Sequence, residues 1–279
     1  MKVAIIGLGL IGGSFAIALK ENEMANHICG VEKNESISKE AMQLNLVDEI
    51  VSMDEAIRKS DLVVLATPVD VMVKILPTIM DMVDQQVVID LGSTKRPMVD
   101  ILKEHPLRKQ YVACHPMAGT EFSGPSAAIP NLYKNKRCVI CNKEESDPAA
   151  LTLVEKVIKQ MEMKLLYMSA EDHDMHTAYI SHISHISSFA LALTVLEKEE
   201  DVDKIFELAS GGFGSTVRLA KSSPDTWTPI FKQNRDNLLD VVDEHINALS
   251  QFRSYLIKNN FDGIYAMIEE ANKIKKILK

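Results

Sequence analysis

The stretch V-A-I-I-G-L-G-L-I-G-G-S, residues Val3 to Ser14, decides the fold of this 279-residue chain. Four apolar residues at its start predict a strand that is buried on both faces. The glycines that follow have the G-x-G-x-x-G spacing of a tight strand-to-helix turn, in which the backbone can approach a pyrophosphate. The free N–H groups at the start of the helix would hold the phosphates. The predicted dinucleotide-binding loop consists of Gly7, Gly9, Leu10, Ile11 and Gly12.

An acidic residue stands where this motif needs one. A second apolar run, His27 to Val31, ends at Glu32, which lies twenty residues after Gly12. In this motif an acid at that distance accepts hydrogen bonds from the ribose hydroxyls. A carboxylate there would also repel a 2′-phosphate, so the sequence favours NAD as the cofactor. The neighbouring Lys33 leaves NADP open as the alternative.

Short apolar runs then alternate with helical patterns as far as residue 168. This alternation predicts an α/β domain, a Rossmann-type doubly wound and mostly parallel sheet, over residues 1–168. Ligands of such sheets bind at the carboxyl ends of the strands. The residues expected there are Thr67 and Pro68, which we assign to the cofactor, then Gly92 to Lys95 and His115 to Glu121.

The rest of the chain, residues 169–279, predicts an all-α second domain. Ser169 and Asp172 form a possible capping box at its start. The expected segments are a helix from Ser169 to about Lys198, a short one to Leu208, a break at Gly211 to Gly214, and a long helix from about Thr228 to Lys258. Thirty helical residues span about 45 Å, more than a small domain needs, so we expect a homodimer interface here.

Charge and composition exclude several classes of protein. The net charge is −8 and the sequence pI is about 5.5, which argues against nucleic acid and against an anionic membrane as partners. Beyond the glycine-containing start, no segment is expected to span a bilayer. The four cysteines fit a reducing compartment, and Cys138 and Cys141 lie within one predicted strand without a second pair for zinc. We therefore expect a cytoplasmic protein.

Five motifs together resemble the prephenate dehydrogenase family of tyrosine biosynthesis. They are G-L-G-L-I-G-G-S, G-S-T-K at Gly92 to Lys95, H-P-M-A-G-T-E at His115 to Glu121, S-H-I-S-H at Ser181 to His185, and G-G-F-G-S-T-V-R-L-A-K-S-S-P at Gly211 to Pro224. The resemblance implies the oxidative decarboxylation of prephenate to 4-hydroxyphenylpyruvate, or of arogenate to tyrosine, with NAD or NADP. Which substrate is preferred stays open.

The resemblance also implies roles for individual residues. His115 matches the catalytic histidine that takes the proton of the ring hydroxyl, and Ser93 matches the serine that orients it. Arg218 matches the arginine that binds a substrate carboxylate, a task that suits a planar bidentate donor. The remaining matches are His185 as a substrate contact, Thr120 and Glu121 at the mouth of the pocket, and Trp227 near the active site, with the partner subunit as its expected source.

Other interpretations remain beside this one. A non-catalytic NAD-sensing regulator and a methyltransferase share the glycine-rich start, although the intact Ser93, His115 and Arg218 set speaks against the regulator. His173, His176, His182 and His185 lie close together in the sequence, but their spacing does not favour zinc, so no metal is expected. We expect His173 and His176 to face solvent. Because the chain ends at Lys279, we expect no appended regulatory domain.

Overall fold

The computed structural model describes residues 1–201 and 210–277 and contains one eight-stranded sheet. Its strand order is β3-β2-β1-β4-β5-β6-β7-β8, and every neighbouring pair is parallel except β6 and β7. The strands are β1 (Lys2–Ile6), β2 (His27–Val31), β3 (Glu49–Ile50), β4 (Leu62–Leu65), β5 (Val87–Asp90), β6 (Tyr111–Pro116), β7 (Arg137–Cys141) and β8 (Lys164–Met168). The predicted mostly parallel sheet is confirmed.

Helices cover both faces of this sheet, because alternate residues of each strand point to opposite sides. Ile5 and Val64 pack on one face with α1 (Leu10–Glu21) and α6 (Pro148–Gln160). Ile6 and Leu65 pack on the other face with α3 (Met53–Lys59), α4 (Val69–Met82) and α5 (Arg96–Ile101). The helix α2 (Glu35–Gln43) follows β2 and is capped by the side chain of Asn34, the residue before it. With both faces covered by helices, the carboxyl ends of the parallel strands remain open for a ligand.

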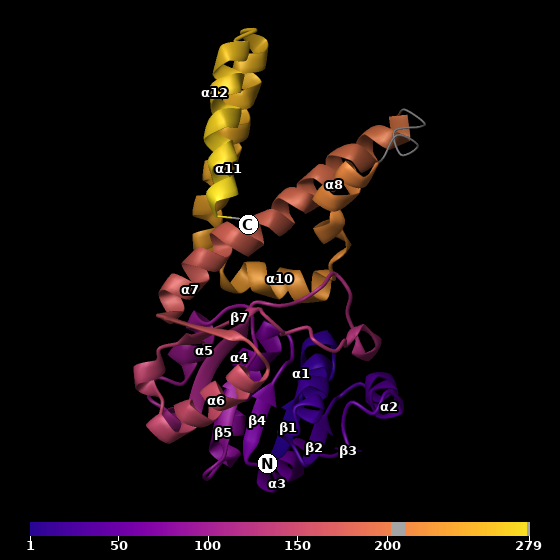
Figure 1. Ribbon diagram of the computed structural model, residues 1–279, viewed down its shortest axis with the longest axis vertical. Coiled ribbons are helices and arrows are strands. Elements are labelled where there is room, and N and C mark those ends of the chain that lie inside the picture. Colours follow the sequence, from indigo (N-terminus) through magenta and orange to yellow (C-terminus); the bar gives the residue numbers. More distant parts are fainter. Residues whose placement is uncertain (202–209, 278–279) are drawn as a thin grey trace.

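The second part of the chain is helical and stands above that edge (Figure 1). It starts with α7 (Ala170–Thr177), passes through a π-helical turn at Ala178–His182, and continues as α8 (Ile183–Asp201). Ser169 accepts a hydrogen bond from the Asp172 N–H at 3.0 Å, which confirms the predicted cap. The helices α9 (Gly211–Thr216), α10 (Pro224–Gln233), α11 (Arg235–Ile257) and α12 (Phe261–Ala271) follow.

Two expectations for this part were wrong, and a third cannot be compared. The glycine run does not break the chain: α9 begins there, with Gly214 N–H donating to the Ser210 carbonyl at 3.0 Å. The long helix does not start at Thr228, because the chain turns at Asn234 between α10 and α11, and neither glycine nor proline marks that turn. The predicted short helix to Leu208 falls at residues 202–209, outside the described part.

One described helix, Ala170–Lys198, is long and apolar enough to cross a membrane by length and composition. The expectation that no such segment exists was therefore wrong. Length and composition alone are weak evidence for a span. The first half of this helix holds His173, Asp174 and His182, which are buried and hydrogen-bonded to other elements of the protein. The bonds of His173 and Asp174 attach it to the sheet domain.

Candidate active site

The glycine loop forms a cradle that fits a dinucleotide. Gly7 has a φ of +97°, and a β-carbon there would lie 2.8 Å from backbone atoms of Ala66 and Thr67. By contrast, a β-carbon on Gly9 would meet no atom within 4 Å, so the space above the loop is open. The Thr67 hydroxyl next to the loop is buried and has no hydrogen-bond partner among the described residues. An open surface beside a buried hydroxyl that has no protein partner fits the binding of a dinucleotide here.

Glu32 lies at the carboxyl end of β2, beside this loop. Its carboxylate accepts hydrogen bonds from the backbone N–H of Asn34 at 2.9 Å and from that of Leu8 at 3.4 Å. The carboxylate is therefore held beside the phosphate loop, where it could accept hydrogen bonds from a bound ribose. The position of Glu32 agrees with the role that the motif predicts for it.

The lysine of the G-S-T-K motif has a structural role. Lys95 is fully buried and forms an ion pair with the equally buried Asp90. Its ammonium also donates to the Cys114 carbonyl at 2.6 Å, and the Tyr111 hydroxyl donates to Asp90 at 2.6 Å. A paired and hydrogen-bonded charge of this kind ties β5 to β6 beneath the site. Within this motif Ser93 is half-buried, whereas Thr94 and Lys95 are buried.

His115 lies on β6 near its carboxyl end and is only 9% exposed. Burial, then the nearby His173, Lys95 and His182, lower the pKa of His115 well below its ordinary value. The ring is therefore neutral near pH 7 and can accept a proton. Its Nδ1 atom lies 2.8 Å from Nε2 of His173 on α7.

His173 and its neighbour Asp174 were missed as site residues. They are 1% and 2% exposed, so the expectation that His173 faces solvent was wrong, although His176 is exposed as expected. The carboxylate of Asp174 accepts from the backbone N–H of Lys95 at 2.7 Å and from that of Arg96 at 3.0 Å. In the sequence, the adjacent histidine and aspartate soon after the last strand were the one pattern that could have indicated a role in the site.

Arg218 and Glu121 meet at the entrance to the site. The guanidinium of Arg218 lies 2.8 Å from the Glu121 carboxylate, and its side chain remains 51% exposed. A hydrogen bond from its own backbone, followed by Arg218, lowers the pKa of Glu121. A cavity of about 560 Å³ opens beside this pair. It is lined by Glu121, Phe122, Ser123, Ser126, Ala127, Ile129, Lys221 and Ser223.

His182, His185 and Trp227 form an aromatic cluster next to His115. The Trp227 ring is stacked on His185 with centroids 3.3 Å apart, and meets His182 edge to face at 5.9 Å. Burial lowers the pKa of both histidines, that of His182 to about 4. Trp227 reaches this cluster from its own chain, so the expected contribution from a partner subunit is not needed to bring it here.

The structure brings most of the predicted site residues together, but the predicted contact between Ser93 and His115 is not among them. Ser93 makes no hydrogen bond to His115 within the described residues, so the orienting contact expected of it is absent. The partner of the His115 ring is His173 instead. Thr120 is exposed, and its hydroxyl accepts from the Phe122 N–H at 3.2 Å in the loop after β6.

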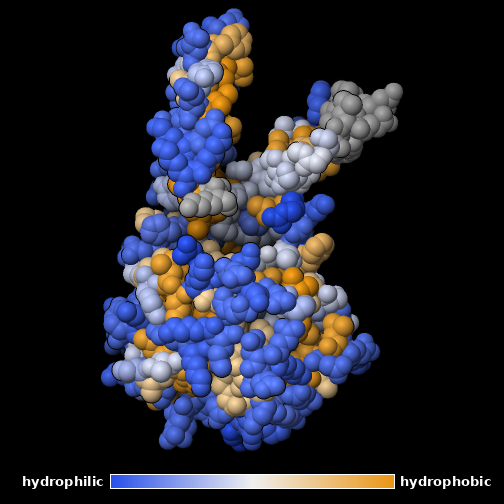
Figure 2. Space-filling view, viewed as in Figure 1, coloured by the Kyte–Doolittle hydropathy of each residue, from blue (hydrophilic) through white to orange (hydrophobic). Residues whose placement is uncertain are grey.

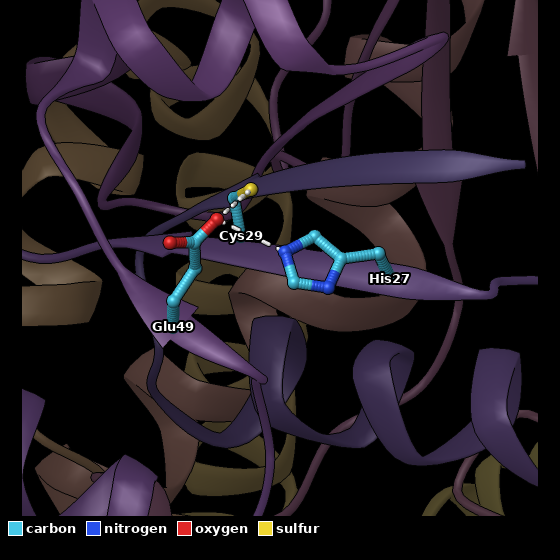
Figure 3. Close-up of side chains that lie close together, drawn as sticks. All are labelled: His27, Cys29 and Glu49. Atoms are coloured by element: carbon cyan, nitrogen blue, oxygen red, sulfur yellow. Dashed lines mark hydrogen bonds and ion pairs between the residues drawn. The ribbon is translucent and has the colours of Figure 1, made fainter.

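Among the described residues, one group of side chains could offer three ligands to a metal ion, and it is far from this site in the sheet. His27, Cys29 and Glu49 converge at β2 and β3 (Figure 3). Glu49 already accepts from His27 at 2.9 Å and from the Lys59 ammonium at 3.1 Å, and these bonds lower its pKa to about 2. Because Lys59 supplies the positive charge, we interpret the group as a salt bridge at the sheet edge.

The doubly wound sheet, the glycine cradle and the neutral histidine at the carboxyl edge together define a dinucleotide-binding protein with a helical second domain over its binding crevice. Comparison with known families identifies it further. Residues 15–167 match the family model for the prephenate dehydrogenase nucleotide-binding domain, and residues 169–270 match that for the prephenate dehydrogenase dimerization domain. The chain belongs to the prephenate dehydrogenase family.

Individual relatives agree with this assignment. The chain is 31% identical to the prephenate dehydrogenase of Bacillus subtilis over 273 residues, which cover 96% of this chain and 74% of the relative. A crystal structure of prephenate dehydrogenase from Aquifex aeolicus, in complex with hydroxyphenyl propionate and NAD+, is similar with a TM-score of 0.87 and 29% identity, covering 99% of this chain and 97% of the other. Synechocystis arogenate dehydrogenase is similar with a TM-score of 0.77 and 26% identity over the whole of both chains.

Proposed function

We propose that this protein is an NAD-dependent prephenate dehydrogenase, which converts prephenate to 4-hydroxyphenylpyruvate by oxidative decarboxylation. The observation that carries the proposal is the buried, neutral His115 at the carboxyl edge of the sheet. Family membership and the NAD+ complex of the Aquifex aeolicus relative support it. NAD, when bound, supplies the hydride acceptor, and Gly7, Gly9, Glu32 and Thr67 would hold it.

The chemistry asks little of the protein beyond positioning and one proton transfer. Prephenate is a cyclohexadiene with a hydroxyl on C4 and a carboxylate on the opposite ring carbon, C1. At C4 the O–H proton passes to His115 and the C–H hydride to NAD, which leaves a carbonyl. The bond from C1 to the carboxylate then breaks, CO2 leaves, and the electron pair enters the ring. The C4 oxygen regains the proton from His115 as the phenol of an aromatic product.

Each remaining site residue has a proposed part in this reaction. Arg218 binds a substrate carboxylate, which would compete with Glu121 for its guanidinium. His185, stacked on Trp227, presents its Nε2 to the substrate, because its Nδ1 lies 3.1 Å from the Ser181 carbonyl. Thr120 and Glu121 close the entrance, and Ser93 lies beside the reacting hydroxyl. The protein positions the ring, and aromatisation supplies the driving force.

An arogenate dehydrogenase that forms tyrosine is the alternative, and the Synechocystis relative favours keeping it. The two substrates differ only in a keto or an amino group on the side chain. Initial rates of NADH or NADPH formation with each of the four substrate and cofactor pairs decide between them. Prephenate with NAD should be fastest. A preference for arogenate or for NADP would correct one part of the proposal, and NAD binding without turnover of any pair would favour a non-catalytic NAD sensor.

We also propose that the chain divides after residue 168 and that residues 169–279 form a homodimer. Apolar side chains along α11 and α12 lack cover, and Figure 2 shows them on the side of this arm that faces α8. Five of them are 50% to 66% exposed: Leu249, Leu256, Phe261, Tyr265 and Ile268. Light scattering should give twice the 31.1 kDa chain mass. We place the protein in the cytoplasm because its four cysteines are free and buried.

A further inference from the structure

Two buried residues of α7 continue the site behind His115. Nε2 of His173 lies 2.8 Å from Nδ1 of His115, and Nδ1 of His173 lies 2.7 Å from the Asp174 carboxylate. The three side chains are 9% exposed or less. They form a line of hydrogen bonds from the carboxylate through one ring to the other, and this line joins the sheet to the helical part of the chain.

The hydrogen-bond pattern assigns the protons along this line. A carboxylate only accepts, so Nδ1 of His173 must carry the hydrogen. Burial lowers the pKa of His173 although Asp174 opposes the change, so the ring is neutral and its Nε2 is an acceptor. Nδ1 of His115 must then donate. The remaining nitrogen of His115, Nε2, keeps its lone pair and can take a proton.

Asp174 is itself held in its accepting role. Backbone N–H groups of Lys95 and Arg96 donate to its two carboxylate oxygens at 2.7 and 3.0 Å. Asn234, at the turn between α10 and α11, donates to the Asp174 carbonyl at 2.7 Å and lies 3.1 Å from Nδ1 of His182. Two backbone N–H groups and Nδ1 of His173 therefore hold the carboxylate, while Asn234 holds the backbone of the same residue, so the carboxylate stays an acceptor.

The other charged groups that face the two rings do not alter this assignment. Lys95 is near both rings, but its ammonium is paired with Asp90 on β5 and donates to the Cys114 carbonyl. His182 is near His115 and is neutral, since burial lowers its pKa to about 4. Asp174 is thus the one carboxylate among the described residues that is hydrogen-bonded to this pair of rings.

We propose that His173 and Asp174 are positioning residues, which hold His115 in the tautomer with hydrogen on Nδ1 and stabilise the positive charge when Nε2 takes the substrate proton. This inference rests on the proposed function. No proton moves along the line: His115 carries the added proton on Nε2, His173 remains neutral, and Asp174 remains a carboxylate. The same line explains how a buried histidine with a lowered pKa can still act as a base, because the charge forms beside a fixed acceptor.

Asp174→Asn tests the assignment most sharply. The amide can donate to Nδ1 of His173, which would reverse both rings and place the hydrogen of His115 on Nε2, where it blocks proton uptake. In a buried carboxylate-histidine pair, the wrong tautomer costs up to about 10⁴-fold in kcat. We expect a loss of about 10² to 10⁴-fold in kcat with a nearly unchanged KM and NAD affinity.

Two variants of His173 separate positioning from packing. His173→Leu removes the acceptor and should lose about 10²-fold or more in kcat. His173→Gln offers its amide oxygen near the position of Nε2 and should recover part of that loss. His176→Gln, an exposed histidine on the same helix, is the matched control and should behave as the unaltered protein. Equal kcat for folded His173→Leu and the unaltered protein would overturn the proposal.

The tautomers can also be read without any turnover. In the unaltered protein, nitrogen NMR of ¹⁵N-histidine should show His115 neutral near pH 7, with hydrogen on Nδ1, and Asp174→Asn should move it to Nε2. Hydrogen on Nε2 of His115 in the unaltered protein would refute the positioning role of His173 and Asp174, whether or not prephenate is the substrate. If instead the spectrum is as expected and prephenate is not turned over, the proposed function fails and the tautomer assignment stands.

Discussion

The guanidinium of Arg218 lies 2.8 Å from the carboxylate of Glu121, which joins two residues that are 97 positions apart in the chain. Glu121 lines the cavity and lies in the loop after β6, while Arg218 lies at the start of the helical turn Arg218–Lys221. An arginine that is already aligned with a carboxylate needs little reorganisation to bind that of a substrate.

Replacing Arg218 should therefore weaken substrate binding without changing the affinity for NAD. Arg218→Lys keeps the charge but loses the planar fork, so we expect KM for prephenate to rise about 10-fold or more. NAD affinity, measured by fluorescence titration, should not change. Arg235→Lys, at an exposed arginine paired with Asp236, is the control. A KM within twofold of the original would remove Arg218 from the substrate site.

Glu32 is expected to select the cofactor. Glu32→Gln keeps the size of the side chain and removes the charge that accepts from the ribose and repels a 2′-phosphate. We expect the NAD dissociation constant to rise about 10-fold and the preference for NAD over NADP to shrink. Glu35→Gln, whose side chain is 90% exposed on α2, should have no effect. An unchanged cofactor preference would contradict the role of Glu32.

The glycine loop predicts opposite outcomes for two substitutions. A methyl group on Gly9 has open space, whereas one on Gly12 would overlap the Gly7 carbonyl oxygen. Gly9→Ala should keep its thermal midpoint and lose about 10-fold in NAD affinity, because the methyl group fills the cofactor space. Gly12→Ala should lose about 1–3 kcal/mol of stability. Normal NAD affinity in Gly9→Ala would show that the cofactor does not approach this loop.

The buried histidines predict how stability depends on pH. Burial lowers the pKa of His115, His173 and His182 in the fold, that of His182 to about 4, while unfolding returns it to about 6.5. Between these values the unfolded chain binds more protons, so the free energy of unfolding falls as the pH drops below about 6.5. For His182 alone the loss is about 2 kcal/mol at about pH 5.

Urea unfolding at about pH 7 and about pH 5 measures this loss, since protonation of these histidines stabilises the unfolded chain only at the lower pH. His182→Gln should reduce the difference between the two pH values, even if the variant is less stable at both. His176→Gln should leave the difference unchanged, because that side chain is exposed. A difference of equal size in His182→Gln and the unaltered protein would show that His182 does not contribute to it.

The sheet was predictable because its strands are short apolar runs with clear ends. Val3 to Ile6 and Leu62 to Leu65 are buried on both faces, so their burial appears directly in the sequence. The two-residue strand β3 carries no such pattern and was not predicted. The turn at Asn234 was missed for another reason: its position is set by side-chain bonds to Asp174 and His182, which no local pattern reveals.

The candidate site was predictable where a motif carried it, and not elsewhere. The glycine spacing and the resemblance placed His115, Arg218 and the cofactor loop. His173 and Asp174 were missed because the first turns of α7 read A-E-D-H-D-M-H-T, a polar pattern without a buried face. Their burial comes from tertiary packing, where α7 meets the carboxyl edge of the sheet and the Lys95 and Arg96 amides supply the partners.

We propose that His115 is the base in the NAD-dependent oxidation of prephenate. The most direct test compares the unaltered protein with His115→Asn, following NADH formation from prephenate and NAD binding in the same preparations. We predict rapid NADH formation by the unaltered protein and a loss of about 10²-fold or more in the variant, with NAD affinity retained. Near-normal turnover by a folded His115→Asn variant would show that His115 is not the base.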